Sequence, residues 1–167
     1  HASYQSSIGT LSLGTEIRKE QINSSNIGER ERYNSGLYAQ IKSSPWEKVD
    51  LNFGTYLNYN STYGWQIYPG LDLSFTITPE LRIVGNIGSS QRIPSFTDLY
   101  LDQRPGNIGT PDVVPEDAFQ SEIGFKLNHG SFQLSSFYFH RTINNFIDWT
   151  RSQNTDPWEA NNTGKLF

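Results

Sequence analysis

The sequence predicts an all-β fold, an antiparallel up-and-down segment of a transmembrane β-barrel. Three observations support this prediction. Apolar and polar side chains alternate with a period of two, aromatic residues gather near the ends of the alternating segments, and short turns alternate with longer connections. A barrel strand needs only about 9–11 tilted residues, so these segments are long enough although no apolar run of about 18 residues, as a transmembrane helix requires, occurs.

Composition agrees with a fold of strands and turns. The 167 residues include 14 Gly, 9 Tyr, 10 Phe and 4 Trp but no Met. The mean hydropathy of -0.59 suits a barrel, because every second side chain of a barrel strand faces water. A net charge of -4 supplies no basic surface for nucleic acid. The absence of Cys excludes a disulfide framework and thiolate chemistry.

The alternation predicts one strand after another along the chain. In the clearest segment, apolar Leu51 and Phe53 share one face while polar Asn52 lies on the other. The same period predicts strands over residues 11–18, 36–42, 49–59, 65–77, 81–87 and 120–127. Around 132–147 both faces are apolar, so the pattern predicts no orientation there. Pro69 does not fit its predicted strand, since proline deletes a ladder hydrogen bond.

The connections separate a barrel from a soluble β-sandwich, the alternative all-β fold. Short turns are predicted at 43–47, 78–80 and 128–130, and longer connections at about 22–32, 60–64, 92–118 and 149–160. Bacterial barrels show this asymmetry, with turns in the periplasm and loops outside. Sandwich strands are commonly about 5–6 residues long, shorter than these segments. Aromatic residues near the loop ends, with Trp46 at a short turn, resemble lipid-interface girdles; they are Tyr33, Tyr59, Tyr63, Trp65, Trp149 and Trp158.

Motifs in the second half of the chain follow a fixed order. Residues 91–100 (QRIPSFTDLY) hold Arg-x-Pro-Ser and then Leu-Tyr, residues 109–116 (GTPDVVPE) are similar to Gly-Asn-Pro-x-Leu-x-Pro-Glu, and residues 120–125 (QSEIGF) hold Glu-x-Gly. Residues 143–149 and 158–161 continue the series. Together these motifs resemble the β-barrel of TonB-dependent outer-membrane receptors. Residues 25–32 and 64–70 are similar to that family as well, so the resemblance covers nearly the whole chain.

The resemblance implies a bacterial outer-membrane importer of a metal chelate or cobalamin, and not an enzyme. In that family a barrel of about 22 strands holds a folded plug. Ligand binds to external loops and plug, and the TonB complex supplies energy through a box near the N-terminus. Residues 1–167 start without a signal peptide, so we expect a piece of the barrel domain without plug or box, about seven strands and part of another. A passive porin and a soluble all-β binding module are the alternatives.

Most motif residues are expected to be architectural. Prolines fix φ and end strands, and glycines permit conformations that other residues resist. We expect Arg92 and Glu122 either to pair inside the barrel wall or against the plug, or to remain solvated charges of the lumen. The motif residues are Arg92, Pro94, Leu99, Tyr100, Gly109, Pro111, Pro115, Glu116, Glu122 and Gly124.

Ligand contacts are expected at the loop tips, where aromatic rings beside Arg can stack on an anionic iron chelate and match its charge. For the tryptophans, anchoring at the lipid interface is the alternative. The candidates are Tyr100, Asp102, Gln103, Arg104, Asn107, Trp149, Arg151, Asn154 and Trp158.

No metal, cofactor or catalytic site is predicted. Five acidic loop residues lack the spacing of a calcium loop and are expected to be solvated; they are Asp98, Asp102, Asp112, Glu116 and Asp117. The three His residues are scattered, so no pair has metal-ligand spacing and no Ser-His-Asp arrangement stands out.

Overall fold

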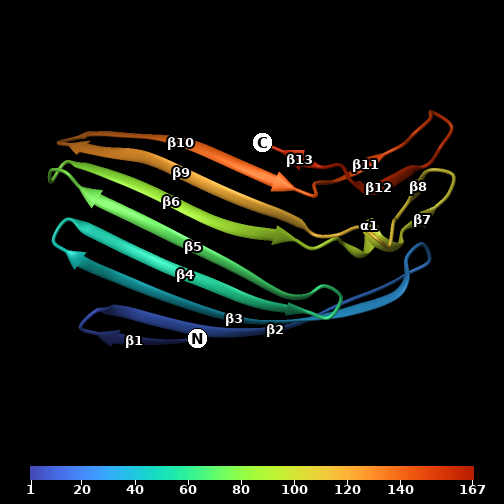
Figure 1. Ribbon diagram of the computed structural model, residues 1–167, viewed down its shortest axis with the longest axis horizontal. Helices are drawn as coiled ribbons and strands as arrows, with labels where there is room; N and C mark the ends of the chain where they lie inside the picture. The colour runs from blue at the N-terminus through green and yellow to red at the C-terminus, as the bar shows by residue number, and fades with distance from the viewer.

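The computed structural model describes all residues, 1–167, as two β-sheets and one short helix (Figure 1). The large sheet is antiparallel and consists, in spatial order, of β1 (Ala2–Ser6), β2 (Gly9–Ser24), β3 (Gly28–Trp46), β4 (Val49–Asn60), β5 (Gly64–Thr76), β6 (Leu81–Arg92), β9 (Glu116–His129), β10 (Phe132–Asn144) and β13 (Lys165–Leu166). The small sheet consists of β11 (Ile147–Thr150), β12 (Trp158–Asn162), β8 (Asn107–Ile108) and β7 (Asp102–Gln103), and α1 is Phe96–Tyr100. The predicted all-β antiparallel fold is confirmed.

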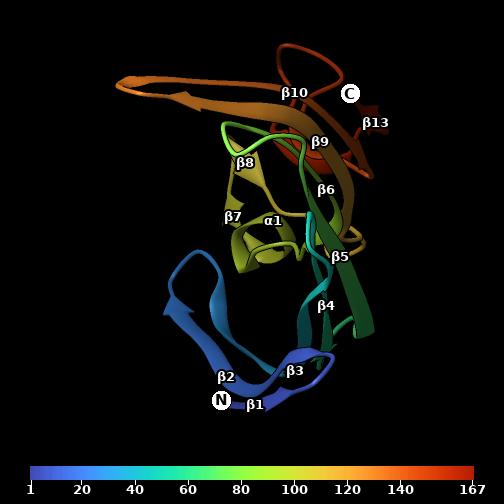
Figure 2. The same cartoon turned by 90° about the vertical axis from the view of Figure 1, so that its left-hand side faces the viewer.

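We call the large sheet the membrane wall. Its two edges, by which we mean the two ends of its long strands, differ in the length of their connections. The short turns predicted near 43–47, 78–80 and 128–130 all lie at one edge, on the left of Figure 1. At the opposite edge lies the loop rim, which we define as residues 93–115 and 145–164 with the two hairpin tips, 25–27 and 61–63. The wall curves into a trough, and Figure 2 shows α1, β7 and β8 on its concave side.

The prediction of a longer connection at 22–32 is wrong, and the connection predicted at 60–64 lies where it was expected but is short. Residues 25–27 alone join β2 to β3, and residues 61–63 alone join β4 to β5. Gly28 and Gly64 begin the following strands with φ of 79° and 73°, a conformation that costs glycine little. The chain therefore reverses tightly, and the strands lengthen where loops were expected.

The apolar side chains of the wall are exposed. Leu11, Ile41, Phe53, Leu71 and Ile87 are successive cross-strand partners, so they form one apolar row from β2 to β6. Phe53 is 48% and Ile87 is 47% exposed, which shows that no second sheet covers this face. Only 14 of the 167 residues are buried, so the wall has no core of its own. Its apolar face is the surface that contacts lipid.

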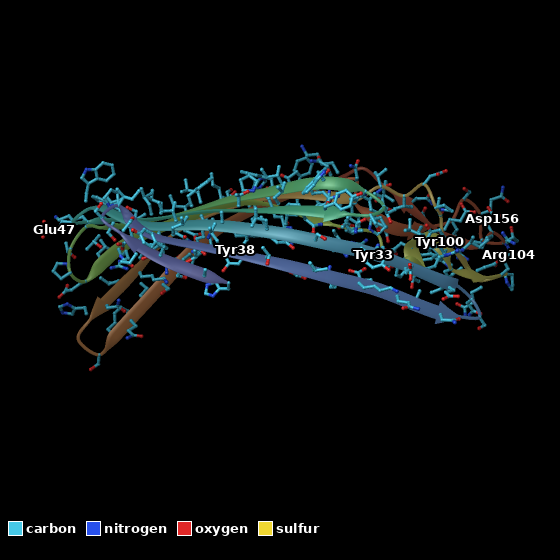
Figure 3. The ribbon with its side chains drawn as sticks, turned by 90° about the horizontal axis from the view of Figure 1, so that it is seen from below. Tyr33, Tyr38, Glu47, Tyr100, Arg104 and Asp156 are labelled. Carbon is cyan, nitrogen blue, oxygen red and sulfur yellow. The ribbon has the colours of Figure 1, made fainter.

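The side chains that alternate with this apolar row along each strand point to the concave, luminal face. Tyr38 is one of them (Figure 3). In β10, for which the sequence predicted no orientation, both faces carry aromatic rings. Tyr138 pairs with outward Ile123, whereas Phe137 lies opposite Gly124 on the luminal face. A Cβ on Gly124 would overlap the Phe137 ring. Gly124 thus makes room for an aromatic side chain in the lumen.

Pro69 lies where β5 separates from β6. Pairing between these strands starts only at Gly70, which is opposite Gly88. The carbonyl of Pro69 points into this gap, where it accepts a hydrogen bond of 3.5 Å from the Ser89 hydroxyl. The N–H and carbonyl of one strand residue point to the same side, so the N–H that proline lacks would have faced the same gap. No ladder bond is lost, which explains how the strand tolerates proline.

The aromatic residues expected at the loop ends divide into two groups. Tyr59 and Trp65 are cross-strand partners on the outer face, with ring centroids 5.1 Å apart. Tyr63, Trp149 and Trp158 instead belong to the loop rim. The hydrophobic core cluster also lies in this rim; it consists of Leu99, Val113, Ile147 and Ala160, against which Tyr100 and Trp149 pack. The single helix has five residues, and no helix here is long and apolar enough to cross a membrane.

Candidate functional site

A polar row crosses the luminal face of the wall. Lys42, Asn52, Asp72, Asn86 and Glu122 are successive cross-strand partners. The Asn52 amide donates to Asp72 Oδ2 at 2.7 Å, and the Asn86 amide donates to Glu122 Oε1 at 3.2 Å. Luminal carboxylates are thereby held in fixed positions, ready to bind polar groups inside the barrel.

Two hollows of the luminal face lie next to each other and share part of their lining. The upper one, of about 390 Å³, is floored by Gly54, Gly70 and Gly88, which are in register. The lower one, of about 1130 Å³, continues to the edge with short turns. A Cβ on any of these glycines would meet its nearest neighbour at 3.7 Å or more, an ordinary van der Waals distance. Glycine is therefore not needed here to avoid a clash, and its effect is to leave the hollow deeper. Both hollows are lined by Asn52, Asp72 and Asn86.

Three tyrosines border the upper hollow on the side nearer the loop rim. Tyr38, Tyr56 and Tyr68 are direct cross-strand partners. The rings of Tyr56 and Tyr68 are stacked, with centroids 6.2 Å apart and planes at 16°. The upper hollow therefore offers aromatic faces on one side and amides and carboxylates on the other.

Where the wall meets the loop rim, Arg92 at the end of β6 joins two carboxylates, Glu116 at the start of β9 and Asp98 in the rim. Its Nε and Nη2 lie 3.0 Å from the two oxygens of Glu116, and its Nη1 lies 3.2 Å from Asp98 Oδ2. Glu116 also accepts a 2.8 Å hydrogen bond from the backbone N–H of Ile147. This cluster connects β6, α1, β9 and β11, because each contributes a partner or lies next to one.

The segment 93–115 folds back under its own helix. Ser95 and Asp98 form a capping box, in which the Ser95 hydroxyl accepts from the Asp98 N–H and the Asp98 carboxylate accepts from the Ser95 N–H. Gly109 donates to the Leu101 carbonyl at 2.7 Å. A Cβ on Gly109 would lie 2.6 Å from the backbone nitrogens of Tyr100 and Leu101, so only glycine allows this approach.

The sequence of this chain matches a known family over nearly its full length. A family model described as "TonB dependent receptor-like, beta-barrel" covers residues 2–166. The chain belongs to this family. TonB-dependent receptor barrels lie in the bacterial outer membrane, and the family comprises transporters, not enzymes. The predicted family and outer-membrane localisation are thereby confirmed, and the soluble all-β module is excluded.

Individual relatives agree with this assignment. The chain is 27% identical over 153 residues to the vitamin B12 transporter BtuB of Photobacterium profundum and 22% identical over 158 residues to that of Vibrio vulnificus. These matches cover 88% and 92% of this chain but only 24% and 25% of the relatives, so it spans about a quarter of their length.

Solved structures show the same fold. The siderophore receptor PirA from Pseudomonas aeruginosa superposes with a TM-score of 0.88 at 18% identity, over 98% of this chain and 32% of PirA. A point mutant of the ferric enterobactin receptor PfeA from the same organism, in complex with enterobactin, gives a TM-score of 0.82 at 18% identity, over 93% of this chain and 29% of PfeA.

The motif residues that were expected to be architectural occupy distinct places in this TonB-dependent receptor barrel. Pro94 and Leu99 are buried, and Pro115 directly precedes β9. Pro111 is exposed in the turn before Val113. Arg92 and Glu122 do not pair with each other: Arg92 binds Asp98 and Glu116 in the rim, whereas Glu122 accepts from Asn86 in the wall.

Most candidate ligand-binding residues come together in the small sheet of the rim. Asn107 of β8 is opposite Gln103 of β7 on one side and Trp158 of β12 on the other. The Arg151 guanidinium lies 4.7 Å from the Trp158 ring centroid, and its Nη1 donates to the Asn154 carbonyl at 3.1 Å. An open hollow of about 680 Å³ is lined by Asp148, Trp149, Thr150, Arg151, Ser152, Gln153, Asn154 and Trp158.

The other candidates are engaged differently. Tyr100 packs against the rim core and lies 4.3 Å below the Arg30 guanidinium, so only part of its ring is free. Arg104 is exposed at the far end of the rim, 3.6 Å from the Asp102 carboxylate (Figure 3). Trp149 also packs against the rim core. Trp149 therefore both packs against the rim core and lines the open hollow.

Acidic residues of the rim do not converge. Asp98 and Glu116 both bind Arg92, so neither carboxylate is free for a cation. No group of three His, Cys, Asp or Glu side chains is placed to hold a metal ion.

Residues that the motifs did not identify tie the rim to its neighbours. The Tyr63 hydroxyl donates to the Val113 carbonyl at 3.1 Å, and burial raises the pKa of this phenol. The Asn162 side chain accepts from Val114 N–H at 2.9 Å and donates to the carbonyls of Val114 and Asn145. Arg32 binds the Pro94 carbonyl. Arg32 closes residues 25–32, which belong to the family resemblance but were interpreted as part of a longer connection, and no role was predicted for it.

Proposed function

We propose that the complete receptor takes up a scarce nutrient, cobalamin or a ferric siderophore, across the outer membrane with energy from the TonB complex. The observation that carries this proposal is the placement of the rim. Figure 2 shows α1, β7 and β8 over the concave side of the wall, so the candidate ligand-binding residues border the mouth of the barrel. Below this mouth the luminal hollows continue to the opposite edge.

The charges of the rim favour cobalamin as the nutrient. In segments 93–115 and 145–164 carboxylates outnumber arginines, and ferric catecholates are strongly anionic. A rim of this sign repels such a chelate but accepts a ligand of low charge, which can stack on Trp158 and hydrogen-bond to amides such as Asn107. The vitamin B12 transporters among the relatives agree with this choice. The acidic residues counted are Asp102, Asp112, Asp148, Asp156 and Glu159, and the arginines are Arg104 and Arg151; Asp98 is left out because it is buried and paired with Arg92.

Uptake of radiolabelled cyanocobalamin tests the proposal. The full-length receptor is expressed in cells that lack their own cobalamin receptor, with and without TonB, and a ferric catecholate is tested in parallel. We expect cobalamin uptake that disappears without TonB. Uptake that persists without TonB would favour the passive porin, and uptake of the catecholate alone would refute the preference for cobalamin.

A substitution pair links the uptake to the rim. Removing the Trp158 ring takes away a stacking surface, so Trp158→Ala is expected to weaken cobalamin binding by about tenfold, the equivalent of 1.4 kcal/mol. Trp46→Ala removes an indole that is 67% exposed, against 41% for Trp158, but it lies at the opposite edge and is expected to leave binding unchanged. Equal affinities for the two variants would show that the small sheet does not contact the nutrient.

A further inference from the structure

The β2–β3 hairpin leans over the concave side of the wall at the loop rim and contacts the segment 93–115 (Figures 2 and 3). At the tip, the Asp102 N–H donates to the Asn26 carbonyl at 2.8 Å. One step down, the guanidinium of Arg30 lies over the Tyr100 ring. The hairpin thus touches the segment at several successive points, although the two are far apart in sequence.

The innermost of these contacts belongs to Arg32, which is only 8% exposed. Its Nε binds the Glu20 carboxylate, and its Nη1 donates to the Pro94 carbonyl at 2.6 Å. Its guanidinium carbon lies 4.8 Å from the centroid of the Phe96 ring. One planar group therefore holds a strand of the wall on one side and both ends of the Pro94–Phe96 turn on the other, which suits the rigid fork of arginine and not the point charge of lysine.

The anchor behind Arg32 is itself fixed. The Asn34 amide donates to Glu20 at 3.2 Å, and the Asn60 amide donates to Asn34 at 2.7 Å. Asn60, which is fully buried, accepts the backbone N–H groups of Thr62 and Tyr63 at the tip of the β4–β5 hairpin. Because every member has a partner, the chain of contacts transmits the position of three strands to Pro94.

The two ends of segment 93–115 are held in different ways. The C-terminal end is fixed by Glu116, whose carboxylate is shared by Arg92 and the Ile147 N–H. The N-terminal end leads through α1 to Tyr100 and β7, where the candidate ligand-binding residues begin. Without Arg32, the Pro94 carbonyl loses its donor, and the hairpin keeps only its contacts near the tip with Tyr100 and Asp102. Inside the segment, α1 keeps the Arg92–Asp98 ion pair and the buried Leu99, but neither reaches the hairpin.

We propose that Arg32 is a positioning residue, which fixes α1 and β7 over the barrel mouth and thereby sets the affinity for the nutrient. The proposal rests on the proposed function, since it assigns the bound ligand to the rim. Arg32 contacts backbone and ring of the segment from behind and takes no part in ligand contact.

Binding of radiolabelled cyanocobalamin to the full-length receptor in outer membranes, together with hydrogen exchange of residues 93–103, tests this assignment. Arg32→Ala is expected to weaken binding by about tenfold or more and to speed exchange in α1 and β7. Arg32→Lys is expected to rescue neither fully, because an ammonium group cannot reach Glu20 and the Pro94 carbonyl in the same geometry. Lys19→Ala is the matched control: its ion pair with Glu31 lies on the outer face of the same hairpin, so both readouts should stay at the wild-type values.

A crosslink separates positioning from direct contact. This chain contains no cysteine, so Asn26→Cys with Asp102→Cys introduces one defined pair where the hairpin tip meets β7. Because Asp102 is itself a candidate ligand contact, the reference is the same cysteine pair with Arg32 intact. In the Arg32→Ala background, oxidation of the pair is expected to restore binding to this reference, and reduction is expected to bring back the tenfold loss. Unrestored binding in the crosslinked protein would assign Arg32 to ligand contact and overturn the proposal, as would unchanged exchange in Arg32→Ala. If the wild-type receptor binds no cyanocobalamin, the proposed ligand fails, while hydrogen exchange still decides whether Arg32 positions the segment.

Discussion

In the membrane wall, side chains point alternately to lipid and to the lumen, and few of them are buried; in the loop rim, a small core and enclosed polar groups resemble a soluble domain. The wall depends on its ladders, since 89 of the 106 backbone hydrogen bonds lie within helices and strands. The rim depends on individual side chains such as Arg92 and Asn162, each of which joins several segments. The comparison shows that lipid replaces a core in the wall and that the rim must supply its own.

The same difference determines what a substitution costs. A wall position is judged mainly by which face it occupies, because one face meets lipid and the other meets water. A rim position is judged by the atoms that touch it, because the strands of the small sheet there have only two to five residues and side chains must hold the segments together. Substitutions that test these two rules should therefore differ in size and in where their effects are felt.

The largest effect is expected for a charge on the lipid face. Ile123→Arg in β9 places a guanidinium in the apolar band, where an arginine costs about 2–4 kcal/mol near the bilayer midplane. Gln120→Arg, in the same strand but on the luminal face, is expected to cost little because that face is wet. Equilibrium unfolding of the full-length receptor in lipid vesicles measures both. Equal losses for the two variants would contradict the assignment of faces.

The wall could be predicted from the sequence because lipid and water impose a period of two, which neighbours such as Asn52 and Phe53 display directly. The prediction had no orientation for β10, where luminal Phe137 and Phe139 break the rule that the inner face is polar. It was also wrong for residues 22–32. Charged residues such as Glu29 and Arg30 favoured the prediction of a loop, but they belong to the extended end of the β2–β3 hairpin.

The next effect concerns close approach in the rim. Gly109→Ala is expected to cost about 1–3 kcal/mol of local stability, since the new Cβ would push against the backbone of Tyr100 and Leu101. Gly54→Ala adds the same atom in the wall, where its nearest neighbour would be at 3.7 Å, and should be neutral. Hydrogen exchange of α1 and cobalamin binding report the difference. An unaffected Gly109→Ala variant would show that the segment can shift without loss.

Motifs located part of the rim but not its connections. Arg92, Pro94 and Glu116 stand in a recognisable order along the chain. The sequence around Arg32 gives no sign of its partners, because Pro94 and Phe96 are brought near it only by the curvature of the wall. Sequence patterns report which face a residue occupies, whereas a contact between a hairpin tip and a distant loop depends on the three-dimensional path of both.

The smallest effect is expected for Tyr63→Phe, which removes only the hydroxyl that donates to the Val113 carbonyl. We expect a loss of about 0.5–1.5 kcal/mol, the usual net value of one hydrogen bond, measured as faster exchange near Val113. Tyr138→Phe is the matched control, since its ring is 69% exposed on the outer face and no hydrogen bond involves its hydroxyl.

The pH dependence of the Tyr63→Phe difference identifies its cause. Burial raises the pKa of the Tyr63 phenol above its ordinary value of 10.0, so the folded protein holds this proton more tightly than the unfolded chain. The stabilisation is therefore fully present below pH 10.0 and declines as the pH rises through the higher pKa of the folded state. A difference that already fades at neutral pH would assign the effect to another group and would show that this contact does not tie the β4–β5 tip to the rim.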